Sequence, residues 1–262
     1  MNNNKVIFID YDGTLYHREN NKIYDEVYDL LRKCQDNNID VYLSTGRTMP
    51  YLKNDQLLLS LVKGIIGANG SFLYENGCYT FDHFIDFKDV VDIYNYTKEH
   101  NMSVVFFHRD GAYSSFKDED KFEKFLFYNP MPTIQISDVN MIKEDIELMC
   151  LYTPINEIEP MIPLFKNVTI YKWGASGADI VNNTVTKGKA IKRLIEERKY
   201  LFENTYAIGD GLNDIEMFKV VYNSVAMGNA SDIVKKHAKY VTDSIFDRGV
   251  EKVLIKVLDE QM

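Results

Sequence analysis

The sequence predicts an α/β fold in which a parallel-sheet domain is interrupted by a large inserted α/β domain. At both ends of the chain, short apolar strands alternate with amphipathic helical segments, which is typical of βαβ units with parallel strands. From about residue 82 this rhythm changes to an aromatic-rich stretch that holds the only tryptophan, Trp173. We therefore expect a discontinuous core domain over residues 1–81 and 183–262, with an inserted domain over residues 82–182.

The first part of the core begins with a run of β-branched residues at 6–9, which has the length and composition of a strand buried on both faces. Apolar residues then recur at helical spacing from Val27 to Cys34. The segments that follow are a strand at 39–43, a helix at 57–62 and a strand at 64–70. Asn76-Gly77 stands between two apolar runs and predicts a β-hairpin, because this dipeptide favours the tight turns that join antiparallel strands.

The inserted domain and the last part of the core complete the expected order of elements. In the insert we expect helices at 90–97, 122–126 and 155–165, strands at 104–107, 134–136, 146–152 and 168–173, and a turn at 174–177. A helix at 187–198 follows, and Thr186 is placed to cap its first turn. The remaining segments are strands at 205–208, 224–227 and 240–242, a helix at 231–238 capped by Ser231, and a closing helix at 250–258.

The composition is ordinary for a soluble protein but acidic. Hydrophobic residues make up 45% of the 262 residues, and the formal net charge is −9. This charge argues against nucleic acid or an anionic membrane as the main partner, but it still permits a small anionic substrate in a local cationic pocket. The three cysteines are far apart, which favours a reducing compartment without disulfides or a zinc site. With no signal peptide or membrane-spanning run, we expect a cytoplasmic monomer or homodimer.

Polar side chains follow three of the predicted strands at the point where each strand ends. Asp10 and Asp12 follow the first strand, Thr45 the second, and Asp210 and Asp214 the strand at 205–208. Ligands bind at the carboxyl ends of parallel strands in open α/β sheets. Strand alternation would put Asp10 and Asp12 on one side, where two carboxylates repel unless a cation or a shared proton intervenes. Four converging carboxylates predict a site for a hard cation such as Mg²⁺, which prefers oxygen ligands.

A phosphate site is predicted beside this cation site. The Lys187 ammonium suits a phosphate, the Thr45 hydroxyl can donate to a phosphoryl oxygen, and Gly46 allows the backbone amides to approach closely. Each feature also has an ordinary structural reading: Thr45 as a helix N-cap, Lys187 as a solvated helix start, and residues 209–214 as a surface turn. Their occurrence together, at successive strand ends, favours the functional interpretation.

These segments resemble the motifs of the haloacid dehalogenase superfamily, and specifically its Cof-type sugar phosphatases with a class IIB cap. The four matching motifs are Asp10-Tyr11-Asp12-Gly13-Thr14-Leu15, Ser44-Thr45-Gly46-Arg47, Lys187, and Gly209-Asp210-Gly211-Leu212-Asn213-Asp214. Two further segments, Ala68-Asn69-Gly70 and 226–230, also match this branch. The resemblance implies a Rossmann-like core that holds the motifs, with the insert as a cap between the second and third motifs.

The resemblance also implies a role for each matching residue. Asp10 would attack phosphorus and form an aspartyl-phosphate, and Asp12 would act as general acid and then as general base. Mg²⁺ would be held by Asp10, the main-chain carbonyl of Asp12 and Asp210, while Asp214 holds its waters. Lys187 and Thr45 would neutralise charge on the phosphoryl group, and Asn213 would orient Asp10 or a phosphoryl oxygen. Arg47 would reach a second phosphate or a cap residue, and a structural salt bridge is an equal alternative.

The implied activity is that of a Mg²⁺-dependent phosphatase of small phosphorylated metabolites. Two alternatives stay open: a phosphomutase with the same nucleophile, and a non-catalytic sensor of a phosphorylated metabolite. The cap would read the leaving group, and its candidate residues are His108, Arg109, Tyr113, Lys172 and Trp173. The sequence does not rank a hexose phosphate, a nucleotide, pyridoxal phosphate or a flavin phosphate as the substrate.

Overall fold

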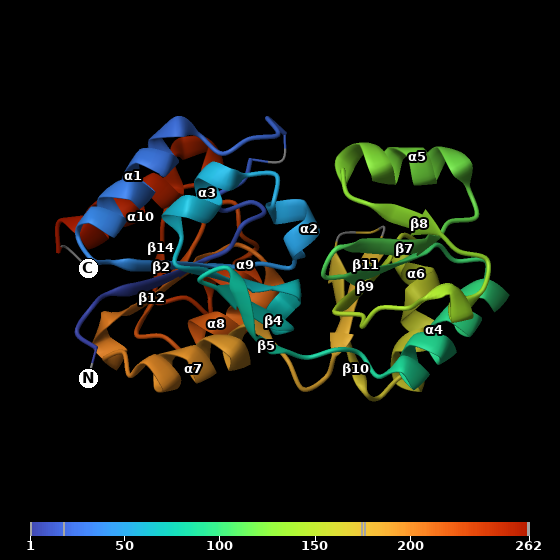
Figure 1. Cartoon of the computed structure of the whole chain (residues 1–262). Helices are drawn as coiled ribbons and strands as arrows, with labels where there is room; N and C mark the ends of the chain where they lie inside the picture. The colour runs from blue at the N-terminus through green and yellow to red at the C-terminus, as the bar shows by residue number, and fades with distance from the viewer. Residues whose placement is uncertain (1, 18, 174, 176, 261–262) are drawn as a thin grey trace. The chain divides into compact units, whose positions relative to one another are not determined.

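A computed structural model describes residues 2–17, 19–173, 175 and 177–260 (Figure 1). The chain divides into two compact units: a first unit of residues 1–45, 55–81 and 186–262, and a second unit of residues 46–54 and 82–185. These units differ from the predicted domains mainly in residues 46–54, which the prediction assigned to the core. Helix α2 (Met49–Leu52) lies in this segment, and the ammonium of Lys53 lies 3.6 Å from the carboxylate of Asp110 in the second unit.

The first unit is built on an eight-stranded sheet whose strand order is β14-β13-β12-β1-β2-β3-β4-β5. Every pair from β14 to β3 is parallel, and β4 turns back antiparallel to β3. The strands are β1 (Val6–Ile9), β2 (Asp40–Ser44), β3 (Gly64–Gly67), β4 (Phe72–Glu75), β5 (Cys78–Asp82), β12 (Thr205–Gly209), β13 (Asn223–Ala226) and β14 (Tyr240–Val241). The predicted parallel core sheet is therefore confirmed.

Helices cover both faces of this sheet. The side chains of β1 alternate between the two faces, so they pack into an apolar layer on each side. Phe8 packs in one cluster with Ile191 and Leu194 of α7 (Lys187–Arg198) and with Met217 of α8 (Ile215–Phe218). Figure 1 shows α1 (Asp25–Asp36), α3 (Gln56–Leu61) and α10 (Gly249–Leu258) on the opposite side of the sheet from α7 and α8. The two-sided burial of β1 explains its uninterrupted apolar sequence.

The hairpin between β4 and β5 forms at the predicted position. Its turn residues, Asn76 and Gly77, both have positive φ angles, 53° and 82°. A two-residue turn with left-handed angles at both positions matches the twist of paired antiparallel strands, and asparagine and glycine adopt those angles at low cost. The hairpin prediction is confirmed.

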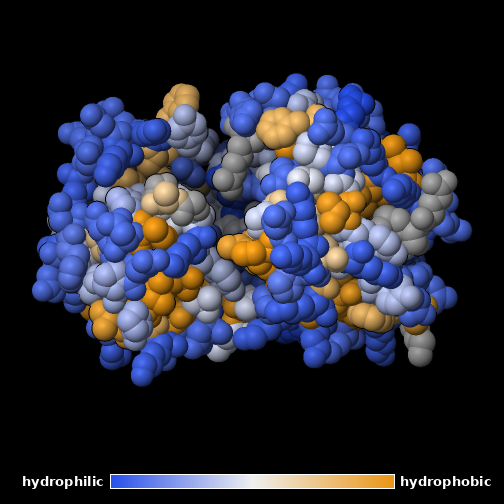
Figure 2. Space-filling model, turned by 180° about the vertical axis from the view of Figure 1, so that it is seen from behind, coloured by the Kyte–Doolittle hydropathy of each residue, from blue (hydrophilic) through white to orange (hydrophobic). Residues whose placement is uncertain are grey.

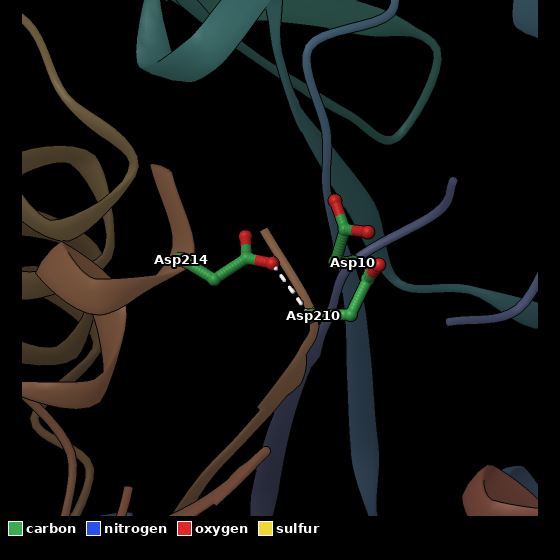
Figure 3. Close-up of side chains that lie close together, drawn as sticks. All are labelled: Asp10, Asp210 and Asp214. Atoms are coloured by element: carbon green, nitrogen blue, oxygen red, sulfur yellow. Dashed lines mark hydrogen bonds between the residues drawn. The ribbon is translucent and has the colours of Figure 1, made fainter. Parts of the chain in front are cut away.

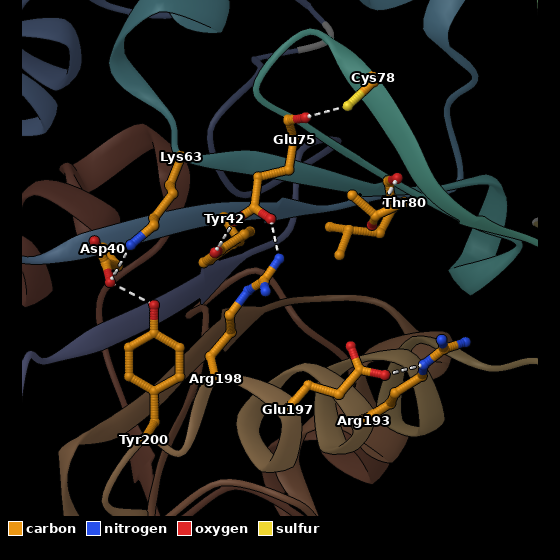
Figure 4. A network of polar contacts seen from close by, with 11 residues as sticks. Asp40, Tyr42, Lys63, Glu75, Cys78, Thr80, Arg193, Glu197, Arg198 and Tyr200 are labelled. Carbon is orange, nitrogen blue, oxygen red and sulfur yellow. Dashed lines mark hydrogen bonds and ion pairs between the residues drawn. The ribbon is translucent and has the colours of Figure 1, made fainter. Parts of the chain in front are cut away.

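A polar network ties β2 and β4 to the carboxyl end of α7 (Figure 4). The buried carboxylate of Glu75 accepts a hydrogen bond from the Tyr42 hydroxyl at 2.6 Å and forms an ion pair with Arg198. Next to it, Asp40 accepts hydrogen bonds from the Tyr200 hydroxyl and, at 2.7 Å, from the Lys63 ammonium. Burial and the neighbouring Glu75 raise the pKa of Tyr42, so its phenol stays protonated and donates.

We expect Tyr42→Phe to lower the free energy of unfolding by about 1.5–3 kcal/mol, because the variant leaves an oxygen of the buried Glu75 carboxylate without its phenol donor. Urea denaturation of the two proteins measures the difference. Tyr24→Phe is the matched control, since the Tyr24 hydroxyl accepts an exposed hydrogen bond from Asn20; its expected effect is below about 0.5 kcal/mol. Equal losses in the two variants would contradict a stabilising role for the network.

The second unit has a six-stranded sheet with the order β10-β11-β9-β6-β7-β8. Its strands are β6 (Val104–His108), β7 (Gly111–Ser115), β8 (Thr133–Gln135), β9 (Leu148–Leu151), β10 (Val168–Trp173) and β11 (Gly177–Asn182). An apolar core lies between one face of the sheet and the helices α4 (Phe87–Glu99) and α6 (Ile155–Ile158). On the other face, α5 (Glu119–Tyr128) contacts Phe107 and Tyr152 through Phe125 (Figure 1).

Several local predictions differ from the structure. Strands β7 and β11 were not predicted, and the expected turn at 174–177 falls partly on residues 174 and 176, outside the described residues, while β11 already begins at Gly177. The expected helix at 155–165 is α6 followed by a 3₁₀ segment, Glu159–Leu164, because Pro160 and Pro163 cannot donate helical hydrogen bonds. The expected helix at 231–238 is only α9 (Asp232–Lys235), and Ser231 makes no side-chain cap bond.

The described part of the chain contains no helix that is long and apolar enough to cross a membrane. Figure 2 shows one face of the molecule, where hydrophilic residues surround several smaller apolar patches.

Candidate active site

Three parallel strands bring the predicted site residues to one edge of the first unit's sheet. Strand β1 pairs with β2 on one side and with β12 on the other, and Ile9 lies in register with both Leu43 and Ile208. Asp10, Thr45 and Asp210 each follow the carboxyl end of one of these strands. The Asp10 amide extends the ladder by donating to the Ile208 carbonyl at 2.9 Å, and Thr45 donates likewise to Ile66 at 2.9 Å. The predicted convergence of these residues at one edge is therefore observed.

Lys187 is the first residue of α7, and its side chain extends into the site. The Thr186 side chain accepts a hydrogen bond from the Lys189 amide at 3.0 Å, which confirms the predicted N-cap and fixes the start of the helix. The Lys187 ammonium is completely buried and lies 2.6 Å from Oδ1 of Asp10 and 2.7 Å from Oδ1 of Asp214. The alternative reading of Lys187 as a solvated helix start is therefore wrong.

The loop after β12 holds its two aspartates with different sets of donors. Oδ2 of the fully buried Asp214 accepts the backbone amides of Asp210 at 2.9 Å and Gly211 at 2.8 Å. The Asp210 carboxylate accepts the Thr14 hydroxyl at 3.1 Å and the Asn229 amide at 3.2 Å. These contacts fix both carboxylates in place, and both Asp214 oxygens already accept hydrogen bonds from protein donors.

Gly13 makes room for Asp210. Its φ angle is +88°, and a Cβ atom at this position would lie 2.5 Å from Oδ2 of Asp210. Both its backbone angle and its lack of a side chain therefore suit the turn after β1. The Asn229 amide also donates to the Gly13 carbonyl at 3.0 Å, which ties this turn to the loop after β13.

Asp10, Asp210 and Asp214 form an acidic cluster in which one oxygen from each side chain lies within 4.8 Å of the others (Figure 3). The cluster opposes three carboxylates to the single ammonium of Lys187. Burial, together with the charges of Asp214 and Asp210, raises the pKa of Asp10 well above its ordinary value despite Lys187. Burial alone would lower the pKa of Lys187, but Asp10 and Asp214 outweigh it and raise that pKa. The excess negative charge and the all-oxygen donor set fit a hard divalent cation.

The structure places Asp12 in a turn rather than on an extended strand. Strand β1 ends at Ile9, and the Tyr11 carbonyl accepts hydrogen bonds from the amides of Leu15 and Tyr16 at 3.0 and 2.7 Å. Strand alternation therefore does not determine where Asp12 points, and the expectation based on it does not apply. The Asp12 carboxylate is not part of the acidic cluster found among the described residues; its predicted metal contact runs through its main-chain carbonyl.

The remaining predicted residues have varied surroundings. Thr45 is completely buried, and its carbonyl accepts the Asn69 amide at 3.0 Å. It is not a helix N-cap, because the next helix begins at Met49 after Thr48. The Asn213 amide donates to the Asn69 side chain at 2.8 Å, so the structure gives it a partner that was not predicted. Gly46 and Arg47 belong to the second unit, where the Arg47 guanidinium lies 3.9 Å from the centre of the Tyr51 ring.

Residue-by-residue reasoning gave no role to three polar residues around the cluster, Thr14, Asn69 and Asn229. Each lies in a segment that resembles the haloacid dehalogenase superfamily, but neither its charge nor its spacing distinguishes it from its neighbours. Asn69 is buried and has a φ angle of 55°, a left-handed conformation that asparagine adopts more readily than most other residues. The loops that supply Asn69 and Asn229 follow β3 and β13, which are two further strands of the same parallel sheet.

Comparisons with known proteins agree with this architecture. A family model for haloacid dehalogenase-like hydrolases matches residues 7–254. The chain is 30% identical over 255 residues to the 5-amino-6-(5-phospho-D-ribitylamino)uracil phosphatase YcsE of Bacillus subtilis, covering 95% of this chain and 94% of the relative. It is 25% identical over 261 residues to a phosphoglycolate phosphatase of Methanobrevibacter smithii, covering 96% and 97% of the two chains.

A solved structure shows the same similarity. The subclass IIB sugar phosphatase BT4131 superposes with a TM-score of 0.85 and 26% identity, covering 96% of this chain and 98% of the other. These findings confirm the predicted fold class and enzyme class, a hydrolase acting on phosphoric monoesters. The chain belongs to the family of haloacid dehalogenase-like hydrolases.

Proposed function

We propose that this protein is a Mg²⁺-dependent phosphatase that releases phosphate from small phosphorylated metabolites through an aspartyl-phosphate on Asp10. The observation that carries the proposal is the convergence of Asp10, Lys187, Asp210 and Asp214 at one edge of the parallel sheet in a member of a hydrolase family. Three relatives named above support it, since their names describe phosphatases of a ribitylaminouracil phosphate, of phosphoglycolate and of sugars.

The first step is nucleophilic attack. An oxygen of the Asp10 carboxylate forms a bond to phosphorus while the bond from phosphorus to the leaving oxygen breaks. Asp12 donates a proton to that oxygen, so the leaving group departs as an alcohol. In the second step, Asp12 takes a proton from a water molecule that attacks the same phosphorus, which releases phosphate and restores Asp10.

Lys187 and Thr45 assist by charge and hydrogen bonding. The Lys187 ammonium lies 2.6 Å from Asp10, so it holds the nucleophile in one orientation and offsets the negative charge that gathers as the phosphoryl group arrives. The Thr45 hydroxyl donates to a phosphoryl oxygen, and Asn213 with Asn69 keeps the loop after β12 beside the loop after β3. Positioning and charge neutralisation of this kind account for most of the catalysis of phosphoryl transfer.

The acidic cluster fits Mg²⁺. Asp10, Asp210 and the main-chain carbonyl of Asp12 would hold the ion, and Asp214 would hold its waters, because both Asp214 oxygens already accept hydrogen bonds within the protein. When bound, the ion supplies positive charge that neutralises the carboxylates and the phosphoryl oxygens.

Removal of the metal is expected to lower phosphate release by about 10²-fold or more, since the ion supplies several kcal/mol of charge stabilisation. The measurement is phosphate release from p-nitrophenyl phosphate and a panel of phosphorylated metabolites, with Mg²⁺ or with EDTA. Mg²⁺ is also expected to raise the melting temperature of the wild-type protein but not that of Asp210→Asn, because ligand binding stabilises only a chain that binds it.

Asp36→Asn is the control for this experiment, since Asp36 is exposed at the end of α1. It should behave as the wild type in both assays. Phosphate release that is unaffected by EDTA would contradict the metal requirement. Phosphoryl exchange between two metabolites without release of phosphate would instead indicate the phosphomutase.

A further inference from the structure

One exposed asparagine, Asn229, joins three separate segments of the first unit. Its side-chain amide donates to the Gly13 carbonyl at 3.0 Å, in the turn after β1, and to Oδ2 of Asp210 at 3.2 Å, in the loop after β12. Its side-chain oxygen accepts the Ile245 amide at 2.9 Å, in the segment after β14. An asparagine side chain has two N–H donors and one acceptor oxygen, so both donors and the oxygen of Asn229 are used.

The main chain around Asn229 gives this side chain a fixed starting point. The Met227 amide donates to the Gly209 carbonyl, at the end of β12, at 2.9 Å. The Gly228 amide donates to the Asp243 carbonyl, after β14, at 2.9 Å. The packing here is close, since a Cβ atom at Gly228 would lie 2.7 Å from the carbonyl carbon of Asp243. The loop after β13 is therefore tied to both neighbouring segments immediately before Asn229.

Both acceptors of the Asn229 amide bear on groups that the proposed function assigns to the metal ion. One acceptor is the carboxylate of Asp210 itself. The other is the Gly13 carbonyl, which follows the carbonyl of Asp12 by one peptide. The peptide that contains the Asp12 carbonyl is planar, and its N–H, that of Gly13, donates to the Tyr16 carbonyl at 3.0 Å. The peptides on both sides of Gly13 therefore have fixed directions.

We propose that Asn229 is a positioning residue of this phosphatase, whose amide holds the Asp210 carboxylate and the main-chain carbonyl of Asp12 in the arrangement that binds the metal ion. Hydrogen bonds to the ligands of a metal set the orientation of those ligands, and their loss commonly lowers metal affinity or activity by about 10- to 100-fold. The proposal rests on the proposed function, because that function assigns both groups to the metal.

A purely structural role for Asn229 predicts a different result. If the side chain only tied the loop after β13 to Ile245, its removal would lower the melting temperature and leave the affinity for Mg²⁺ unchanged. Because Asn229 is exposed, its truncation opens no buried cavity, and we expect the metal-free protein to stay folded. Metal affinity, measured without substrate, therefore distinguishes the two roles.

The test titrates Mg²⁺ into wild type and Asn229→Ala without substrate and follows the melting temperature, which rises as a bound ligand stabilises the folded chain. The apparent Kd for Mg²⁺ is expected to rise about tenfold or more in the variant. The melting temperature in EDTA should change by less than about 3 °C. In a parallel assay with p-nitrophenyl phosphate, the Mg²⁺ concentration that gives half-maximal phosphate release should rise by a similar factor.

Asn37→Ala is the matched control, since Asn37 is also exposed and its side-chain amide donates to the Lys33 carbonyl at 2.8 Å. It should leave the apparent Kd for Mg²⁺ unchanged. Asn229→Leu is a second arm, because leucine keeps the branched shape of the side chain but has neither donors nor an acceptor. It should show the same loss of affinity as Asn229→Ala.

An apparent Kd for Mg²⁺ within about threefold of the wild type in both Asn229 variants would overturn the proposal, while the proposed phosphatase function stands. Loss of the cooperative melting transition of both variants in EDTA would show a structural role and would overturn it as well. A wild-type protein whose melting temperature and phosphate release do not respond to Mg²⁺ would instead remove the metal requirement of the proposed function, and this proposal with it.

Discussion

Asp10→Asn is expected to reduce phosphate release by about 10³-fold or more, while the protein remains folded. The substitution keeps the size of the side chain and leaves an oxygen that accepts from Lys187, but the amide is too weak a nucleophile to attack phosphorus. Measurement of phosphate release in Mg²⁺ with a colorimetric assay, over hours of incubation, gives the residual rate. A rate within tenfold of the wild type would refute the aspartyl-phosphate mechanism.

The stability of Asp10→Asn distinguishes a chemical defect from a folding defect. Burial and two neighbouring carboxylates raise the pKa of Asp10, so its ionised form is held at an energetic cost in the metal-free protein. Removal of that charge should leave the melting temperature unchanged or higher in EDTA. Asp25→Asn, at the start of α1, is the control: a variant prepared and assayed in the same way, which should keep full activity. A melting temperature that falls together with activity would point to a structural defect instead.

Lys187→Met is expected to lower the free energy of unfolding by about 3–5 kcal/mol and to abolish phosphate release. The ammonium lies between two buried carboxylates, at 2.6 Å from Asp10 and 2.7 Å from Asp214, and methionine leaves both of them without their counter-charge. Removal of one member of a buried ion pair has a cost of this size, because the remaining charge stays buried. Urea denaturation in EDTA measures the loss, and a midpoint equal to that of the wild type would contradict it.

The double variant Asp10→Asn with Lys187→Met tests the cause of this loss. Because it also removes one of the two stranded carboxylates, we expect it to be more stable than Lys187→Met alone, with a coupling of about 1–3 kcal/mol. Lys192→Met is the matched control on the same helix, since Lys192 forms an exposed pair with Glu196 at 3.9 Å. Its expected change is below about 0.5 kcal/mol. Strict additivity of the two site substitutions would show that the charges do not interact.

Much of the first unit could be predicted because its signals are local. The apolar run of β1, the Asn76-Gly77 turn and the Thr186 N-cap each depend on a few neighbouring residues, and the structure forms all three. The chemistry-bearing residues Asp10, Thr45 and Asp210 could be placed at one edge for a simple reason: parallel strands present the same end at the same side of a sheet.

Prediction failed where the local signal was weak or the partner was distant. Strand β7 is made largely of small and hydroxyl residues, and β11 carries the charged Asp179, so neither has a strong local strand signal; they form strands through their pairing with β6 and with β9, respectively. Residues 46–54 were assigned to the core by their place in the sequence, yet their contacts place them in the second unit. The partner of Asn213 is Asn69, 144 residues away, and no spacing pattern connects them.

The fold class, the order of most elements and the charged residues at the strand ends could all be predicted from the sequence. The folded chain was needed to show that Lys187 is buried between Asp10 and Asp214, and that Asp210 accepts hydrogen bonds from Thr14 and Asn229. Secondary structure follows from short-range periodicity and turn chemistry. The pairing of a buried charge depends on which side chains packing brings within about 3 Å, and packing joins residues without regard to their separation in the chain.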